Sequence, residues 1–207
     1  MARDTQSIVK MSRREGYALH PKAHKALLKR PTPPGQQSGG RGGRPQKASQ
    51  YSLQLREKQK VKRLYGLLEK QFSNLMKEAS RVSGQSGQIL LQLLERRLDN
   101  TIYRAGFAPS RRAARQLATH GHFMLNGTRV DIPSIRVKPG DEIVLRDHSK
   151  QSDYFKRHDE TSPAPSAYPG WLKVDRKHVS VSVTGVPTRD EAEPDINEQL
   201  IVEYYSR

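Results

Sequence analysis

Apolar side chains recur at helical spacing in the segment that follows residue 51. From Ser52 to Arg81 they are separated by one, three or four positions, which predicts one long helix with a single buried stripe. A second helix is predicted from Ser86, which suits a helix start, to Gly106, which suits a left-handed helix end. The stripe of the first helix consists of Val61, Leu64, Tyr65, Leu68, Phe72, Leu75, Met76 and Ala79, and that of the second of Leu90, Leu91, Leu94, Leu98 and Ile102.

A short third helix is predicted between Ser110, a favourable N-cap residue, and Gly121. Its inward positions are apolar and mostly small, and alanine side chains allow close packing against a neighbouring helix. Its outward positions are basic or polar. The inward residues are Ala113, Ala114, Leu117 and Ala118, and the outward residues are Arg111, Arg112, Arg115 and Gln116.

Short strands are predicted after the third helix. Asn126-Gly127 is a residue pair preferred in type I′ turns, and the residues on both sides of it, 123–125 and 128–130, predict a hairpin. A second strand pair is predicted within 135–145, where residues 135–137 and 142–145 flank a turn. Farther along the chain, three valines alternate with Ser and Thr and predict a half-exposed strand at Val179, Val181 and Val183.

Two polar segments separate these elements. Residues 31–50 contain too much Pro and Gly for a regular element, so we expect a basic loop or an extension that its partner orders. Residues 149–170 are polar and contain three prolines, which predicts a connecting loop. Residues 196–205 close the chain as a short apolar helix or strand, and we expect its apolar side chains Ile196, Leu200 and Val202 to pack on the long helix.

The expected fold class is therefore α+β. A helical domain would form from both chain ends, with a small helix-helix-β RNA-binding module inserted between them. We assign residues 1–50 to a basic, Gly/Pro-rich N-terminal extension, residues 51–95 with 186–207 to the helical domain, and residues 96–185 to the α+β module.

The charge of the chain favours a polyanionic partner. Its 207 residues include 37 Lys and Arg against 21 Asp and Glu, a formal charge of +16. The net charge is +9 for residues 1–50, +5 for 51–94, +5 for 95–150 and −3 for 151–207. Because Lys and Arg cluster in the first three quarters, we expect that part to bind nucleic acid and the tail to have another partner.

Membrane and secreted classes lack their signatures. No apolar run approaches the ~18 residues of a membrane span, and the N-terminus leads into no apolar signal-peptide core. A basic protein on a membrane surface needs an amphipathic helix with Trp and Phe on one face, but the lone Trp171 lies in the acidic tail. We expect a soluble, unsecreted protein, and the absence of Cys fits a reducing cytoplasm.

Catalytic and metal motifs are also missing. Gly84-Gln-Ser-Gly87 has the wrong spacing for a nucleophile elbow, and no Gly-rich loop ending in Lys-Ser or Lys-Thr is present. The pairs His20 with His24 and His120 with His122 have no Cys or nearby carboxylate to complete a zinc set. We predict no catalytic residue, no metal and no cofactor, and expect His120 to touch phosphate or cap carbonyl groups.

A cluster of cations lies in the first two turns of the long predicted helix. Only Glu57 is acidic within this stretch, so little internal pairing is available and an external anion is favoured. The competing interpretation is a solvated helix face, which is the usual role of such a run. The cations are Arg56, Lys58, Lys60, Lys62 and Arg63.

Four stretches, which come in order along the chain, resemble the family of the fourth protein of the bacterial small ribosomal subunit. Two of them, Gln54 to Phe72 and Asp195 to Arg207, are specific to that family, and Ser12-Arg-Arg-Glu-Gly16 also fits. The stretch from Leu94 through Leu117 also resembles the family, but the unit from Arg104 to Asp147 is a small RNA-binding module that recurs in other proteins. Because Cys residues that bind zinc in some members are absent here, that zinc site is not expected.

The resemblance implies a primary binder of small-subunit ribosomal RNA that holds a multi-helix junction in the 5′ domain and nucleates subunit assembly. It also implies a position near the channel by which mRNA enters, a contribution to translational accuracy, and the fifth small-subunit protein as a neighbour. The RNA-binding residues expected from the resemblance and the charge pattern are Arg13, Arg14, Arg44, Lys47, Arg56, Lys58, Lys60, Lys62, Arg63, Arg111, Arg112, Arg115, Gln116, His120 and Lys138.

Two other functions remain as alternatives. Arg97-Leu98-Asp99 is similar to the Arg-Leu-Asp of pseudouridine synthases, which carry the same module, but Asp99 precedes the module here and we expect it to pair with an Arg or a helix terminus. A stress-related RNA-binding protein with this module would lack the long helix and the apolar ending.

The acidic tail suggests a protein contact. We expect four carboxylates to be exposed near the helical domain and to attract a basic neighbour, for which the resemblance offers the fifth small-subunit protein. These residues are Asp190, Glu191, Glu193 and Glu198.

Overall fold

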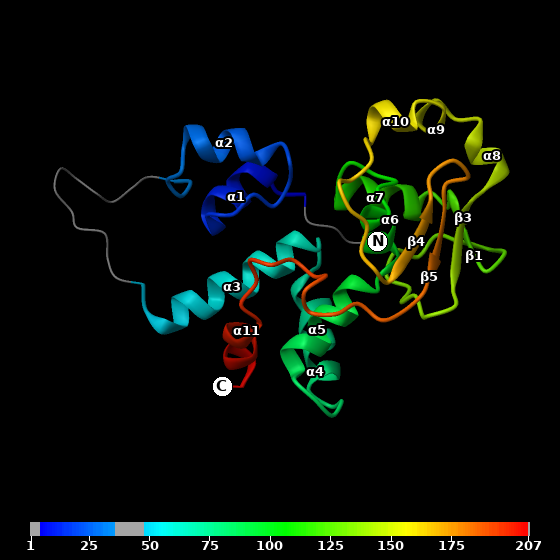
Figure 1. Cartoon of the computed structure of the whole chain (residues 1–207). Coiled ribbons are helices and arrows are strands. Elements are labelled where there is room, and N and C mark those ends of the chain that lie inside the picture. Colours follow the sequence, from blue (N-terminus) through cyan, green and yellow to red (C-terminus); the bar gives the residue numbers. More distant parts are fainter. Residues whose placement is uncertain (1–4, 36–47, 207) are drawn as a thin grey trace. The chain divides into compact units, whose positions relative to one another are not determined.

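The computed structural model describes residues 5–35 and 48–206 (Figure 1). They divide into two compact units. The described residues up to Gly87, together with those from Asp195 onward, form the helical unit, and Gln88–Pro194 form the sheet unit. The fold class is α+β, as predicted. Within the described ranges, no helix is long and apolar enough to cross a membrane.

The helical unit contains segments from both ends of the chain. Helices α1 and α2 fall in the part that the sequence predicted as an extension, and Met11, Leu19 and Ala23 are buried there. The helices are α1 (Ile8–Glu15), α2 (Ala23–Lys29), α3 (Gln50–Leu64), α4 (Glu69–Ala79), the first residues of α5 (Ser86–Glu95) and α11 (Glu198–Tyr205).

The single helix predicted for Ser52 to Arg81 is wrong, because the chain turns between α3 and α4. Gly66 has φ 66°, and the amide of Leu67 donates to the carbonyl oxygen of Lys62 at 2.9 Å. A left-handed glycine with this backward hydrogen bond is a common helix end. The apolar spacing runs unbroken across the turn because Tyr65 and Leu67 are buried in it.

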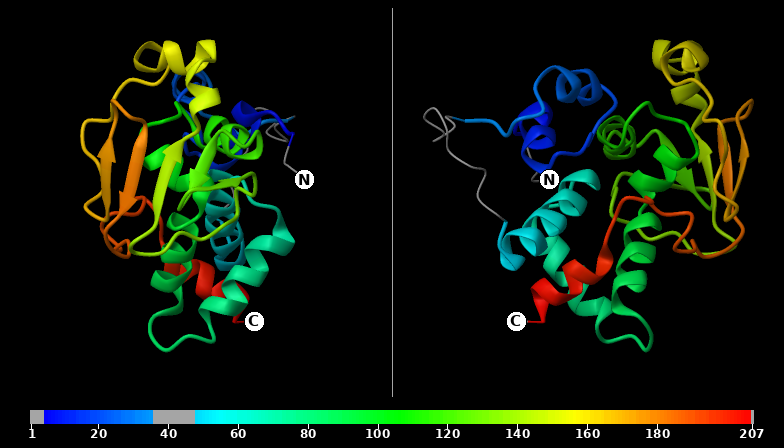
Figure 2. Two further views of the ribbon diagram at one scale, coloured as in Figure 1. Left: turned by 90° about the vertical axis from the view of Figure 1, so that its right-hand side faces the viewer. Right: turned by 60° about the vertical axis from the view of Figure 1, so that its left-hand side comes forward.

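Helix α11 packs on α3, and Figures 1 and 2 show the two helices side by side. The end of the chain is thus a helix rather than a strand. Ile196 and Ile201 are the buried apolar side chains, with exposed fractions of 4% and 0%. Leu200 and Val202, which we expected to pack there, are only partly buried, because the face of α11 that meets the unit is centred on Ile201.

The sheet unit is built on one five-stranded antiparallel sheet with the order β2-β1-β3-β5-β4. Central strand β3 places Ile143 between Leu125 of β1 and Val181 of β5. The strands are β1 (Phe123–Leu125), β2 (Thr128–Val130), β3 (Glu142–Leu145), β4 (Leu172–Asp175) and β5 (Ser180–Val183). The helices of the unit are the rest of α5, α6 (Leu98–Arg104), α7 (Arg111–Thr119), α8 (Asp147–Lys150), α9 (Asp153–Lys156) and α10 (His158–Thr161).

The predicted hairpin at β1 and β2 is confirmed. Asn126 and Gly127 have φ of 49° and 78°, as a type I′ turn requires. The second predicted pair is wrong, because β3 pairs with β1 instead of with residues 135–137. That segment forms only an isolated bridge, Arg136 to Arg97.

The same bridge explains why the predicted helix from Ser86 to Gly106 is two helices. The chain is extended between α5 and α6, where the amide of Val137 donates to the carbonyl oxygen of Arg96 at 2.9 Å. The amide of Leu98 donates to the carbonyl oxygen of Ile135 at 2.8 Å. The backbone groups that a continuous helix would bond internally are therefore used by the neighbouring segment.

Two further differences lie in the second half of the sheet unit. The predicted loop at 149–170 contains the short helices α9 and α10, and α8 overlaps its start. Strand β4 was not predicted, although its four residues alternate between apolar Leu172 and Val174 and polar Lys173 and Asp175. The valine strand is confirmed as β5, although Val179 lies before it with φ 49°.

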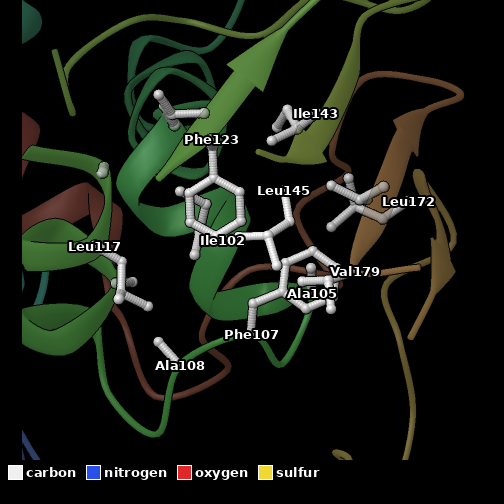
Figure 3. Close-up of a cluster of buried hydrophobic side chains, with 14 of the residues drawn as sticks. Ile102, Ala105, Phe107, Ala108, Leu117, Phe123, Ile143, Leu145, Leu172 and Val179 are labelled. Carbon is white, nitrogen blue, oxygen red and sulfur yellow. The ribbon is translucent and has the colours of Figure 1, made fainter. Parts of the chain in front are cut away.

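The core of the sheet unit lies between the sheet and helices α6 and α7, which cover one side of it (Figure 1). Figure 3 shows Phe107, Phe123 and Leu145 meeting at its centre. The rings of Phe107 and Phe123 stack at 6.2 Å between centroids. This core holds α7 rigidly by its inward Ala114, Leu117 and Ala118, so the opposite side of α7 is presented on a fixed support.

Candidate nucleic-acid interface

The cations of α3 bind carboxylates within the helical unit. Arg56 Nη1 lies 3.2 Å from Glu15 Oε1, and the guanidinium of Arg63 donates to the same oxygen. The Glu15 side chain is fully buried, and burial raises its pKa although both arginines act in the opposite direction. These two arginines thus attach α3 to the last residue of α1.

The lysines of α3 are engaged in the same way. Lys58, which is 3% exposed, lies 2.7 Å from Glu69 and 4.6 Å from the centroid of the Tyr204 ring. Lys62 reaches the other carboxylate oxygen of Glu69 at 3.0 Å. The Tyr205 hydroxyl also donates to Glu69, at 3.0 Å, and burial with the nearby Glu69 charge raises the pKa of Tyr205.

Lys60 pairs with Glu57 at 2.8 Å and donates to the carbonyl oxygen of Asp195 at 2.6 Å. The expectation that this cluster lacks internal partners is therefore wrong. Glu15 comes from α1 and Glu69 from α4, so the carboxylates reach α3 from outside the stretch in which we counted acids. The five cations stabilise the packing of α1, α4 and α11 around α3.

Helix α7 begins as predicted, because the Ser110 hydroxyl accepts a hydrogen bond from the amide of Ala113 at 3.2 Å. Two of its three arginines point to partners inside the sheet unit. Arg111 donates to Glu193 at 2.7 Å, and Arg115 lies 3.7 Å from Asp99. Burial lowers the pKa of Arg115, against the raising effect of Asp99.

Arg112 and Gln116 of α7 form, with the C-cap residue His120, an exposed row that we call the α7 stripe. They are spaced four residues apart, so they lie on one face of the helix, and all three are exposed. Arg112 takes part in none of the ion pairs found among the described residues. Lys138, in the turn before β3, is exposed as well. These are the predicted site residues of the sheet unit that an external anion can reach directly.

The N-terminal candidates differ among themselves. Arg13 is half-buried and donates to the carbonyl oxygen of Thr32 at 3.0 Å, whereas Arg14 is exposed. Arg44 and Lys47 lie outside the described residues. The sequence-based selection omitted exposed cations on or next to α1 and α2, whose only signal was their charge: Lys10, Lys22, Lys25, Lys29 and Arg30.

The prediction that four carboxylates of the tail are exposed is wrong for most of them. Asp190 is exposed, but Glu193 pairs with Arg104 and Arg111, and Glu191 accepts from the amide and hydroxyl of Thr188. Glu198 is half-buried. No group of three His, Asp or Glu residues that could hold a metal ion occurs in the described part of the chain.

Comparison with known proteins decides the family. The model of the ribosomal protein S4/S9 N-terminal domain matches residues 3–95, and that of the S4 domain matches residues 96–143. Small ribosomal subunit protein uS4 of Pelodictyon phaeoclathratiforme is 52% identical over the full length of both chains. The same protein is 50% identical in Chlorobaculum tepidum and 47% in Roseiflexus castenholzii, again over both full lengths. The chain belongs to the uS4 family of small ribosomal subunit proteins.

Membership of the uS4 family agrees with the resemblance found in the sequence. The uS4 relatives are named as proteins of the small ribosomal subunit rather than as enzymes. Asp99, the residue that suggested a pseudouridine synthase, is buried and paired within the protein. Asp99 is 4% exposed, binds both nitrogens of the Arg97 fork at 3.1 and 2.9 Å, and accepts from the amide of Asn100 at 2.9 Å. The expectation that it pairs with an Arg or a helix terminus is confirmed by its ion pair with Arg97.

The two kinds of arginine on α7 predict opposite mutant phenotypes. We expect Arg112→Ala to weaken RNA binding while changing the free energy of unfolding by less than about 0.5 kcal/mol, because its side chain is exposed. Arg115→Ala is expected to destabilise the sheet unit by about 1–2 kcal/mol, since it removes a cation from the buried Asp99. Urea denaturation and RNA titration of both variants measure the difference. Equal loss of stability in the two would contradict it.

Proposed function

We propose that this structural protein of the small ribosomal subunit binds the subunit's ribosomal RNA directly. The observation that carries the proposal is the exposed α7 stripe on a rigid helix within the matched S4 domain. Double-helical RNA is recognised by shape, through phosphates and 2′-hydroxyl groups, because its major groove is too narrow for side chains to read. Arg112 and His120 can donate to phosphates, and the Gln116 amide can bond a 2′-hydroxyl group.

The helical unit would contribute through its N-terminal surface. Lys10, Arg14 and the cations of α2 are exposed, whereas those of α3 are engaged within the unit. The main RNA contacts of this unit would therefore be made by α1 and α2, with a smaller share from α3. Arg44 and Lys47, outside the described residues, are further proposed RNA contacts.

The finer parts of the function rest on the family. The RNA target would be the multi-helix junction of the 5′ domain, and binding as a primary protein would nucleate subunit assembly in the bacterial cytoplasm. A position near the channel by which mRNA enters, a contact with the fifth small-subunit protein and an effect on translational accuracy belong to the same proposal.

Titration of a junction RNA fragment with the full chain at several salt concentrations tests the proposal. Neutralised phosphates release counterions, so log K is expected to fall by about 0.7–0.9 per decade of salt for each contact. Arg112→Ala should reduce this slope by about one contact, whereas Asp131→Ala, an exposed control in the same unit, should leave the slope unchanged. A flat salt dependence of the wild-type protein would refute direct RNA binding.

A further inference from the structure

Glu193 lies between two arginines of the sheet unit. Its Oε1 atom is 2.7 Å from Arg111 Nη2 and 3.4 Å from Arg104 Nη2. The three side chains keep 17%, 12% and 19% of their surface exposed, in the order Glu193, Arg111, Arg104. The site therefore lies at the surface, within reach of a ligand from solvent.

Both guanidinium groups are held in place by other contacts. Arg104 forms two parallel hydrogen bonds of 2.9 Å to the buried carboxylate of Glu95. Arg111 donates to Asn100 Oδ1 at 2.8 Å and lies over the Tyr103 ring at 4.6 Å. Because these contacts do not involve Glu193, the two arginines would keep their orientation if Glu193 left.

Glu193 is attached far more weakly than the arginines. It lies outside every helix and strand, in the segment between β5 and α11, where Pro194 after it is exposed and Ala192 before it is buried. Apart from its two ion pairs, its carbonyl oxygen accepts from Arg189 at 3.2 Å. Moving this segment away would break no helix and no strand pairing.

A carboxylate oxygen between two guanidinium groups occupies the place that suits a phosphate oxygen, since arginine forks bind both anions in the same way. Arg111 is also the neighbour of Arg112, which leads the α7 stripe. A phosphodiester strand bound to Arg112 would thus run close to the site at Arg111, the preceding residue of α7.

We propose that Arg104 and Arg111 form a phosphate-binding site for RNA, which Glu193 fills in the free protein and vacates when RNA binds. The inference rests on the proposed function and concerns the regulation of that RNA-binding surface. Glu193 is then an internal competitor of the RNA, and it also shields two cations from non-specific anions.

The test is the affinity of Glu193→Gln for the junction RNA fragment. Glutamine keeps the shape of the side chain and removes its charge. We expect this variant of the full chain to bind about three- to fivefold more tightly than the wild type at moderate salt, because a partly exposed ion pair no longer competes. Its melting temperature should be equal or lower, a combination that a purely structural Glu193 would not produce.

Two further variants isolate the site. Asp190→Asn removes the same charge from an exposed position of the same segment and should leave affinity nearly unchanged. In an Arg111→Gln background, Glu193→Gln should give little or no gain. An equal gain from Asp190→Asn, or a full gain without Arg111, would overturn the inference.

Side-chain NMR gives a readout that does not depend on the stability of a variant. In the wild-type chain the Arg111 Nη–Hη signals should move when the RNA fragment is added, because Nη2 is the atom that contacts Glu193, and unmoved signals overturn the inference. If the wild type binds the RNA fragment but Glu193→Gln binds it no more tightly, the inference is overturned and the proposed function stands. Failure of the wild type to bind RNA overturns the proposed function together with it.

Discussion

Replacing Asp99 with alanine is expected to destabilise the sheet unit by about 3–5 kcal/mol, because it leaves a buried cation without its carboxylate. Arg97 is only 4% exposed and gives both fork nitrogens to Asp99, and Arg115 approaches from α7. The alanine also removes the acceptor for the Asn100 amide in the first turn of α6. Trp171 is the only tryptophan of the chain and is buried in this core, so its fluorescence during urea unfolding measures the loss.

Asp131→Ala provides the matched control, since Asp131 is exposed in the same unit and should cost less than about 0.5 kcal/mol. Asp99→Asn keeps the side-chain volume and should fall between the two. A free energy of unfolding that is the same for Asp99→Ala and Asp131→Ala would show that the Arg97–Asp99–Arg115 cluster contributes nothing to the fold.

Local signals in the sequence predicted the elements whose cause is local. Ser110 caps α7 because its hydroxyl meets an amide three residues away, and Asn126-Gly127 turns the hairpin because both residues tolerate positive φ. The interruption at Gly66 was missed although glycine is a helix-ending residue, because apolar residues continue at helical spacing through the turn. The split between α5 and α6 depends on backbone hydrogen bonds to residues about 40 positions away, which no local pattern reveals.

Contacts between residues distant in sequence also explain why the candidate site differs most from its prediction. Arg56 and Arg63 pair with a glutamate 41 and 48 positions earlier, and Arg111 pairs with one 82 positions later. A charge count within one helix cannot find such partners. Composition correctly indicated an excess of cations, but the fold decides which of them remain exposed, and Arg112 differs from Arg111 only by its place on α7.

Removing the chain after Pro194 is expected to unfold the helical unit or to open it locally. The deletion takes away Ile196 and Ile201, each worth about 2–5 kcal/mol when truncated in a core. It also removes Tyr204 and Tyr205, which cover Lys58 and Glu69 on α3 and α4. Hydrogen exchange of the full and truncated chains measures the effect, and amides of α3 and α4 should lose most of their protection.

The sheet unit serves as the internal control for this deletion. Amides of β1 and β3 should keep their protection and Trp171 its buried fluorescence, because no residue after Pro194 belongs to that unit. Gln199→Ala, an exposed position on α11, should change neither unit. We expect Ile201→Ala to reproduce part of the loss in α3, since its side chain is fully buried on α11, the helix that packs on α3. Unchanged exchange of α3 in the truncated chain would show that α11 contributes no stability to the helical unit.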